Sequence, residues 1–149
     1  MSGEPDPAAP LVALGEAQLG IKAASANNYD MQGLGLLAFN GAVLAANIAA
    51  KDLLEKLWWM SMIAIAVSIV FCIGVLGAGK FDVGKTVARA KQEYGPLSEP
   101  EINAALVDDL IEALSRANGV LAGKARAVGL AIIALLVAGG LAAISALRS

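Results

Sequence analysis

Three long runs without a charged residue dominate the chain. They cover residues 33–50, 57–79 and 127–147 and contain 18, 23 and 21 residues. A helix rises 1.5 Å per residue, so about 20 residues cross the roughly 30 Å hydrocarbon core of a bilayer. In lipid a helix satisfies its own backbone hydrogen bonds, which makes it the natural form of such runs. The pattern therefore predicts an all-α integral membrane protein with three transmembrane helices.

The stretches before and between these runs are more polar. Residues 1–10 contain three of the five prolines and predict a disordered tail. Residues 11–30 predict a weakly amphipathic N-terminal helix, which either lies at the membrane interface or extends the first span. The charged hexapeptide 51–56 separates the first two spans, and residues 80–97 are expected to form a linker on the other side.

A second amphipathic helix is predicted over residues 98–124, running almost directly into the third span. Ser98 and Glu101 have the spacing of a capping box at a helix N-terminus. Apolar residues then recur at near-helical intervals: Ile102, Leu106, Leu110, Leu114, Ala117 and Leu121. Together with the third span this helix has about 45 residues and some 70 Å of length. Its apolar stripe needs a partner, and the candidates are the N-terminal helix, the membrane surface or a second copy of the chain.

The distribution of basic residues predicts the orientation. With three spans, residues 1–32 and 80–126 share a side and hold eight Lys and Arg, against three on the other side. The positive-inside rule therefore places the N-terminus and the long connection in the cytoplasm and the C-terminus outside. Trp58 and Trp59 then mark the outer interface, where amphipathic rings prefer to sit.

Composition removes several classes of function. Hydrophobic residues make up 58% and charged residues 16% of the chain, and the mean hydropathy is +0.68. A net charge of −2 gives no bulk basicity for binding a nucleic-acid polymer. The chain has no His and a single cysteine, Cys72, so an internal disulfide or a thiolate metal cluster is excluded. We find no nucleophile–base pair and no metal-ligating set, and we expect neither enzymatic activity nor a cofactor.

One short match to a nucleotide-binding motif has to be weighed. Residues 79–86 (GKFDVGKT) fit the phosphate-binding P-loop pattern. That loop works between a strand and a helix, whereas a membrane span precedes it here. We interpret the segment as a juxtamembrane turn with lysines that extend toward the membrane surface.

Asn40 and Asn47 are the polar residues of the first span. They lie seven residues apart and therefore on one helix face, which Gly33 continues. An unpartnered amide in hydrocarbon costs several kcal/mol, so both must face protein or water. One interpretation is a pore-lining or oligomer-forming stripe. The other is interhelical hydrogen bonding within one subunit.

Lys124 and Arg126 precede the third span. The simple interpretation is that they anchor the topology. The sharper one is that they contact anionic lipid phosphates or another anionic ligand.

Two stretches resemble a known family. Residues 29–46 (YDMQGLGLLAFNGAVLAA) and 110–136 (LIEALSRANGVLAGKARAVGLAIIALL) resemble the transmembrane effectors of Pycsar antiphage systems and, more distantly, the SLATT group. The resemblance implies an effector in the bacterial inner membrane that responds to a cyclic nucleotide signal and damages that membrane. The positions that it singles out are Asp30, Asn40, Asn118, Lys124 and Arg126.

We therefore hypothesise a homo-oligomeric effector that self-associates through residues 102–121 and perturbs the lipid bilayer. A non-toxic scaffold or accessory subunit of a membrane complex is one alternative. A small homo-oligomeric channel lined by Asn40 and Asn47 is the other.

Overall fold

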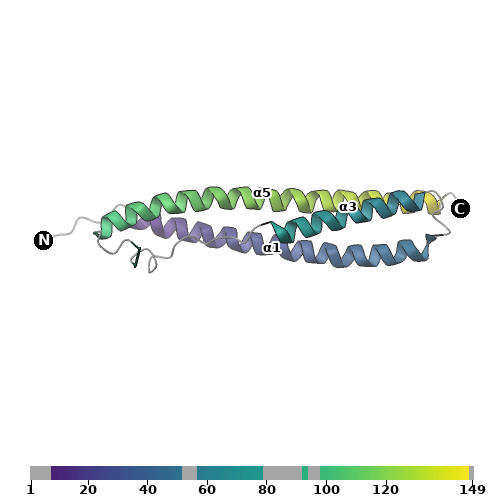
Figure 1. Cartoon of the computed structure of the whole chain (residues 1–149), viewed down its shortest axis with the longest axis horizontal. Coiled ribbons are helices and arrows are strands. Elements are labelled where there is room, and N and C mark those ends of the chain that lie inside the picture. Colours follow the sequence, from purple (N-terminus) through teal and green to yellow (C-terminus); the bar gives the residue numbers. More distant parts are fainter. Residues whose placement is uncertain (1–7, 52–56, 79–91, 94–97, 148–149) are drawn as a thin grey trace. The chain divides into compact units, whose positions relative to one another are not determined.

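The computed structural model describes residues 8–51, 57–78, 92–93 and 98–147. Its elements are α1 (Ala9–Ala49), α3 (Leu57–Gly77) and α5 (Glu99–Ala146), drawn in Figure 1. The described residues contain no strand, so the fold is all-α. Each of the three helices is long and apolar enough to cross a membrane.

Helix α1 joins the first two segments predicted from the sequence. The N-terminal helix over residues 11–30 and the first span over 33–50 form one helix of 41 residues. Met31 and Gln32 join the two parts because both are good helix formers. Pro10 lies in the first turn, where its missing N–H breaks no hydrogen bond. The N-terminal segment therefore continues the helix of the first span, which was one of the two alternatives left open by the sequence.

Helix α5 joins the predicted helix 98–124 to the span 127–147 in a single run of 48 residues. Its start is capped as the Ser98–Glu101 spacing predicted. The Glu101 carboxylate accepts hydrogen bonds from the Ser98 N–H at 2.9 Å and from the Ser98 hydroxyl at 2.6 Å. These two bonds lower the pKa of Glu101. The P-loop-like segment and all but residues 92 and 93 of the predicted linker lie outside the described residues.

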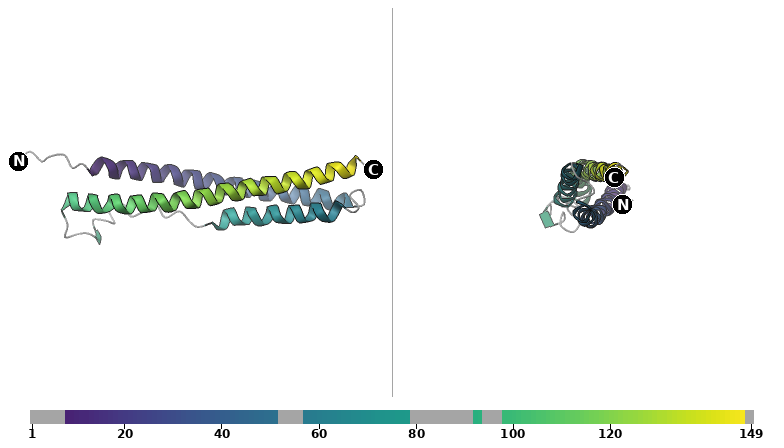
Figure 2. Two further views of the ribbon diagram at one scale, coloured as in Figure 1. Left: turned by 90° about the horizontal axis from the view of Figure 1, so that it is seen from above. Right: turned by 90° about the vertical axis from the view of Figure 1, so that its right-hand side faces the viewer.

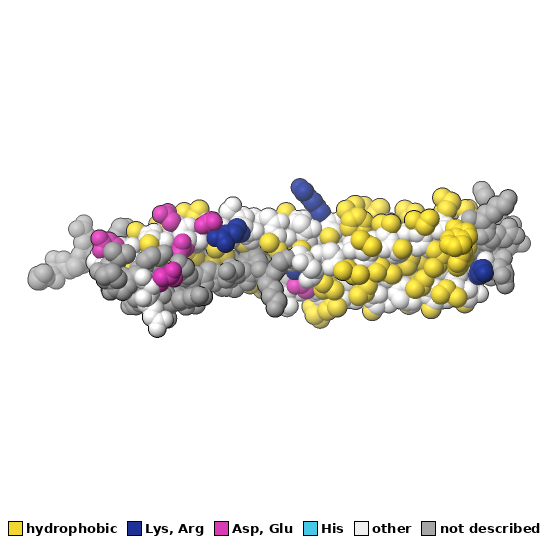
Figure 3. Space-filling model, in the orientation of Figure 1, with side chains coloured by type: hydrophobic (Ala, Val, Ile, Leu, Met, Phe, Trp, Pro, Cys, Tyr) yellow, Lys and Arg dark blue, Asp and Glu magenta, His cyan; other side chains and the backbone are white. Residues whose placement is uncertain are grey.

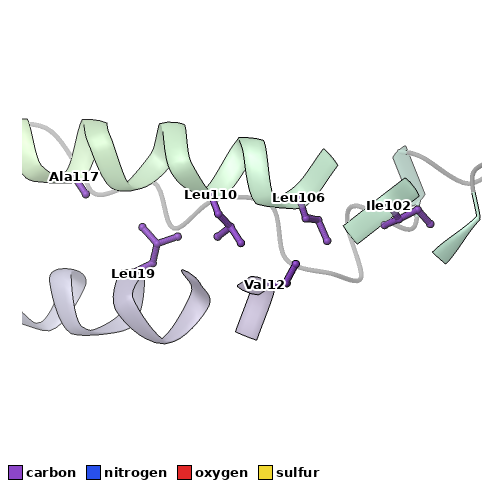
Figure 4. Close-up of a cluster of buried hydrophobic side chains, with 6 residues drawn as sticks. All are labelled: Val12, Leu19, Ile102, Leu106, Leu110 and Ala117. Carbon is purple, nitrogen blue, oxygen red and sulfur yellow. The ribbon is translucent and has the colours of Figure 1, made fainter. Parts of the chain in front are cut away.

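The chain divides into two compact units, which are described separately. Unit 1 comprises residues 1–26 and 80–121, and its core lies between the first turns of α1 and the first half of α5. Figure 4 shows the buried side chains that meet there: Val12, Leu19, Ile102, Leu106, Leu110 and Ala117. The apolar stripe of α5 therefore packs on the N-terminal helix of its own chain, one of the three partners left open by the sequence.

Unit 2 comprises residues 27–79 and 122–149, and the three charge-free runs of the sequence lie within these ranges. The second half of α1, all of α3 and the second half of α5 lie side by side (Figures 1 and 2). The buried residues of α3 alternate at intervals of four and three: Ser61, Ile65, Ser68, Cys72 and Val75. This is the 3.5-residue period of coiled-coil packing. Gly33 allows α1 to approach closely, since a Cβ there would lie 3.2 Å from Val75 Cγ1.

The outer surface of unit 2 is apolar. Large hydrophobic side chains are exposed on all three helices, and yellow side chains cover much of this surface in Figure 3. Examples are Phe39, Ile48, Ile63, Val70, Ile133 and Leu136. A water-exposed surface of this kind would be unfavourable, whereas lipid tails match it.

Candidate functional site

The most unusual feature of unit 2 is a polar core inside the spans. Asn40 is 0% exposed, and its side-chain N–H₂ donates to the Leu36 carbonyl at 2.9 Å and to the Ser68 hydroxyl at 3.0 Å. Ser68 in turn donates to the carbonyl oxygen of Ala131 at 3.0 Å. One relay, from amide to hydroxyl to carbonyl, therefore links α1, α3 and α5.

A second relay lies two helical turns further along. The side-chain N–H₂ of Asn47 donates to the Ser61 hydroxyl at 2.9 Å, and Ser61 donates to the Ala138 carbonyl at 3.4 Å. The backbone carbonyl of Asn47 accepts a hydrogen bond from the Trp58 indole N–H at 3.2 Å. Because all three helices repeat these positions after seven residues, the same three-helix layer forms twice.

Each relay leaves one polar atom without a partner. The side-chain oxygens of Asn40 and Asn47 are buried and accept no hydrogen bond within the described part of the chain. Exchanging the oxygen and nitrogen of the Asn40 amide would not help, because its N–H₂ already meets two acceptors. The amide N–H₂ groups of both asparagines thus have hydrogen-bond acceptors, whereas their amide oxygens have no donor among the described residues.

A buried ion pair lies in the same unit. The Lys124 ammonium contacts the Asp30 carboxylate and is also hydrogen-bonded to it. The Lys124 side chain is 3% exposed, whereas that of Asp30 is 35% exposed. Water therefore reaches the carboxylate far better than the ammonium, and the Asp30 carboxylate neutralises a charge that has lost its hydration.

Unit 1 has a related but more exposed contact. The Lys22 ammonium donates to the side-chain oxygen of Asn118, so α1 and α5 also meet through polar groups there. Glu112 and Arg116 form a surface ion pair at 3.0 Å along α5. A solvated pair at this spacing contributes only about 0.3–0.5 kcal/mol.

These positions bear on alternatives that the sequence left open for two sets of residues. Asn40 and Asn47 bond to serines of their own chain, which agrees with the interpretation of interhelical hydrogen bonding within one subunit. Lys124 is buried against Asp30 and does not present its ammonium to lipid phosphates, whereas Arg126 is exposed. In both cases the reason is that a polar group surrounded by lipid finds its hydrogen-bond or charge partner on a neighbouring helix.

The residues of the predicted self-association stripe differ in how far they are buried. Ile102, Leu106 and Leu110 are buried in unit 1. Leu114 packs partly buried against the same cluster, and Leu121 is half-buried. A second copy would have to displace α1 to reach the buried part of this stripe.

The sequence reasoning missed the partners of the polar residues. Ser61 and Ser68 repeat at the same seven-residue interval as the two asparagines, and this shared spacing was the available signal. Asp30 and Lys124 were each singled out by the resemblance, but nothing in the sequence paired them.

Within the described residues, no group of three or more Cys, Asp or Glu side chains is placed to hold a metal ion. Comparison of the chain with protein-family models, with curated proteins and with solved structures finds no match. The polar core and the ion pair are therefore the candidate functional site, and their geometry has to carry the functional argument.

Proposed function

We propose that this chain is an effector of the bacterial inner membrane, which self-associates on activation and perturbs the bilayer. The observation that carries the proposal is the polar core within the spans. A protein that only anchors itself in lipid does not need four polar side chains in its membrane core, because small and apolar residues also pack transmembrane helices together. Polar groups inside a membrane are costly and usually mark a pathway or a switch.

Two further observations support the proposal. The resemblance of residues 29–46 and 110–136 to membrane effectors of antiphage systems points to the same function, with a cyclic nucleotide signal as the trigger. The excess of Lys and Arg in residues 80–126 supports an N-terminus and a long connection in the cytoplasm, where such a signal would arise.

Inducible expression of the full chain in a bacterial host tests the proposal, with growth and the entry of a membrane-impermeant dye followed together. We expect growth arrest and dye entry. The doubly substituted variant Asn40→Leu with Asn47→Leu should lose both effects while still inserting into the membrane, because it removes the polar core and keeps the apolar character of the span.

The matched control changes the neighbouring lipid-facing residues instead. Phe39→Leu with Ile48→Leu alters two exposed side chains of the same helix and should retain growth arrest and dye entry. Normal growth and a sealed membrane at verified high expression would favour the alternative, a non-toxic scaffold or accessory subunit.

A further inference from the structure

Two orphan acceptors distinguish the polar core from an ordinary buried hydrogen-bond network. The side-chain oxygens of Asn40 and Asn47 are buried and accept no hydrogen bond among the described residues. Buried polar atoms without a partner are uncommon in folded proteins. Inside a membrane they are less tolerable still, because lipid supplies no donor. We call the packed arrangement of α1, α3 and α5 in unit 2 the closed bundle. In it, two buried acceptor oxygens have no hydrogen-bond donor among the described residues.

The neighbouring serine hydroxyls of the closed bundle do not donate to these two oxygens. The hydroxyls of Ser68 and Ser61 are committed to the carbonyls of α5. The side chains in the spans that carry a hydroxyl or an amide are all buried within their own chain: Asn40, Asn47, Ser61, Ser68 and Ser145. A second copy in the same closed state thus presents no hydroxyl or amide donor on the lipid-facing surface of its described spans.

An asparagine amide can itself supply what another asparagine amide lacks. It carries two N–H donors and one carbonyl oxygen, so amides from different copies pair with one another. Copies inserted with the same topology hold their first spans parallel, which brings identical residues to the same depth in the membrane. Asn40 and Asn47 lie one heptad apart on one face of α1, about 10 Å from each other along the helix axis. Asn40 can therefore pair with Asn40 of a second copy at the same time as Asn47 pairs with Asn47.

We propose that the α1 face carrying Gly33, Asn40 and Asn47 is a homotypic assembly site for a second copy of this chain. In the closed protomer this face packs on α3, where Ser61, Ser68 and Val75 contact it. In the assembled state α1 leaves Ser61 and Ser68, and each Asn oxygen accepts an N–H from the corresponding Asn of its neighbour. Gly33, which has no side chain, lets the two helices approach. This inference rests on the proposed function and names the partner and the face by which assembly occurs.

Cysteine cross-linking of the full chain in liposomes tests the assembly face. Cys72 is the single native cysteine and is replaced by Cys72→Ala. A reporter at Leu44→Cys lies one turn from Asn40 at the edge of the face, and the adjacent Ala45→Cys is the lipid-facing control. The protein is reconstituted at rising protein-to-lipid ratios, and disulfide-linked dimers are measured after mild oxidation.

We expect dimers of the Leu44→Cys variant to increase with the protein-to-lipid ratio, while the Ala45→Cys variant stays monomeric. Adding Asn40→Leu and Asn47→Leu should reduce the Leu44→Cys dimers about tenfold, as expected for the loss of two interhelical amide contacts. Adding Asn40→Gln and Asn47→Gln, which keeps both amides, should preserve the dimers and thereby show that the loss is not a folding defect.

Three results would overturn the inference: dimers confined to the Ala45→Cys variant, Leu44→Cys dimers that persist without the amides, or none at the highest ratio. Dye release from the same liposomes separates the two proposals. If the dye is released while only the Ala45→Cys variant forms dimers, the proposal of membrane perturbation stands and the proposed assembly face is rejected. Leu44→Cys dimers in liposomes that stay sealed would keep the face and reject membrane perturbation.

Discussion

Removing the carboxylate of Asp30 gives the sharpest test of the buried ion pair. Asp30→Asn leaves the Lys124 ammonium, which is 3% exposed, without its anionic partner. Breaking a fully buried pair from one side typically costs 3–5 kcal/mol, because an uncompensated charge stays buried. Asp30 is itself about one-third exposed, so water weakens its contribution, and we expect a loss of about 2–4 kcal/mol in the free energy of unfolding.

The reverse substitution should cost less. Lys124→Met strands the carboxylate of Asp30, but that group already reaches water and can remain solvated. The doubly substituted variant Asp30→Asn with Lys124→Met should recover most of the lost stability, because no unpaired charge remains and methionine fills the volume of the lysine stem. The structure thus predicts an order of stability, in which Asp30→Asn is the least stable of the three variants.

Unfolding in mixed detergent micelles measures these differences, with Trp58 and Trp59 as fluorescent reporters. Titration with a denaturing detergent gives the free energy of unfolding of each variant relative to the wild type. The reasoning would be refuted by an Asp30→Asn variant within about 0.5 kcal/mol of the wild type, which is the range of an ordinary surface substitution. A double variant as unstable as Asp30→Asn would refute it equally.

Three further predictions follow from packing and capping. Gly33→Ala should lower stability in the same titration relative to Gly35→Ala, because its Cβ would meet the stiff Val75 side chain at 3.2 Å whereas Gly35 faces open space. Leu106→Ala, at a side chain that is 1% exposed, should cost about 2–5 kcal/mol, whereas Ile111→Ala, at 60% exposure, should cost less than about 1 kcal/mol. Hydrogen bonds from Ser98 lower the pKa of Glu101, so the ionised carboxylate should stabilise the start of α5 above the usual carboxyl pKa of 4.5. This stabilisation should be lost as the pH falls below that value. Circular dichroism should show a corresponding loss of helicity in the wild type and not in Glu101→Gln.

Much of the fold was predictable because the spans carry a strong local signal. Charge-free runs of about 20 residues have few stable forms other than a membrane helix. The Ser98–Glu101 cap was equally local, since three residues separate the two partners. The continuity of α1 stayed open because residues 11–30 have a weak polar pattern that fits either an interfacial helix or an extension of the span. The packing of Val12 and Leu19 against α5 is a contact between distant residues, which local periodicity does not specify.

The candidate site was only half predictable. The seven-residue spacing of Asn40 and Asn47 placed both on one face, but it did not say which neighbour that face meets. Ser61 and Ser68 are ordinary residues in an apolar helix until the helices are packed. The pairing of Asp30 with Lys124 depends on contacts between residues 94 positions apart, which local periodicity does not specify.

We expect copies of this chain to perturb a bilayer when they assemble, without any other protein. Release of an encapsulated dye from sealed liposomes containing only the purified full-length protein tests this most directly, measured over a series of protein-to-lipid ratios. We expect release that rises more steeply than in proportion to the protein density, and that is lost in the Asn40→Leu, Asn47→Leu variant. Liposomes that stay sealed at every ratio, with the protein verified as inserted, would contradict it.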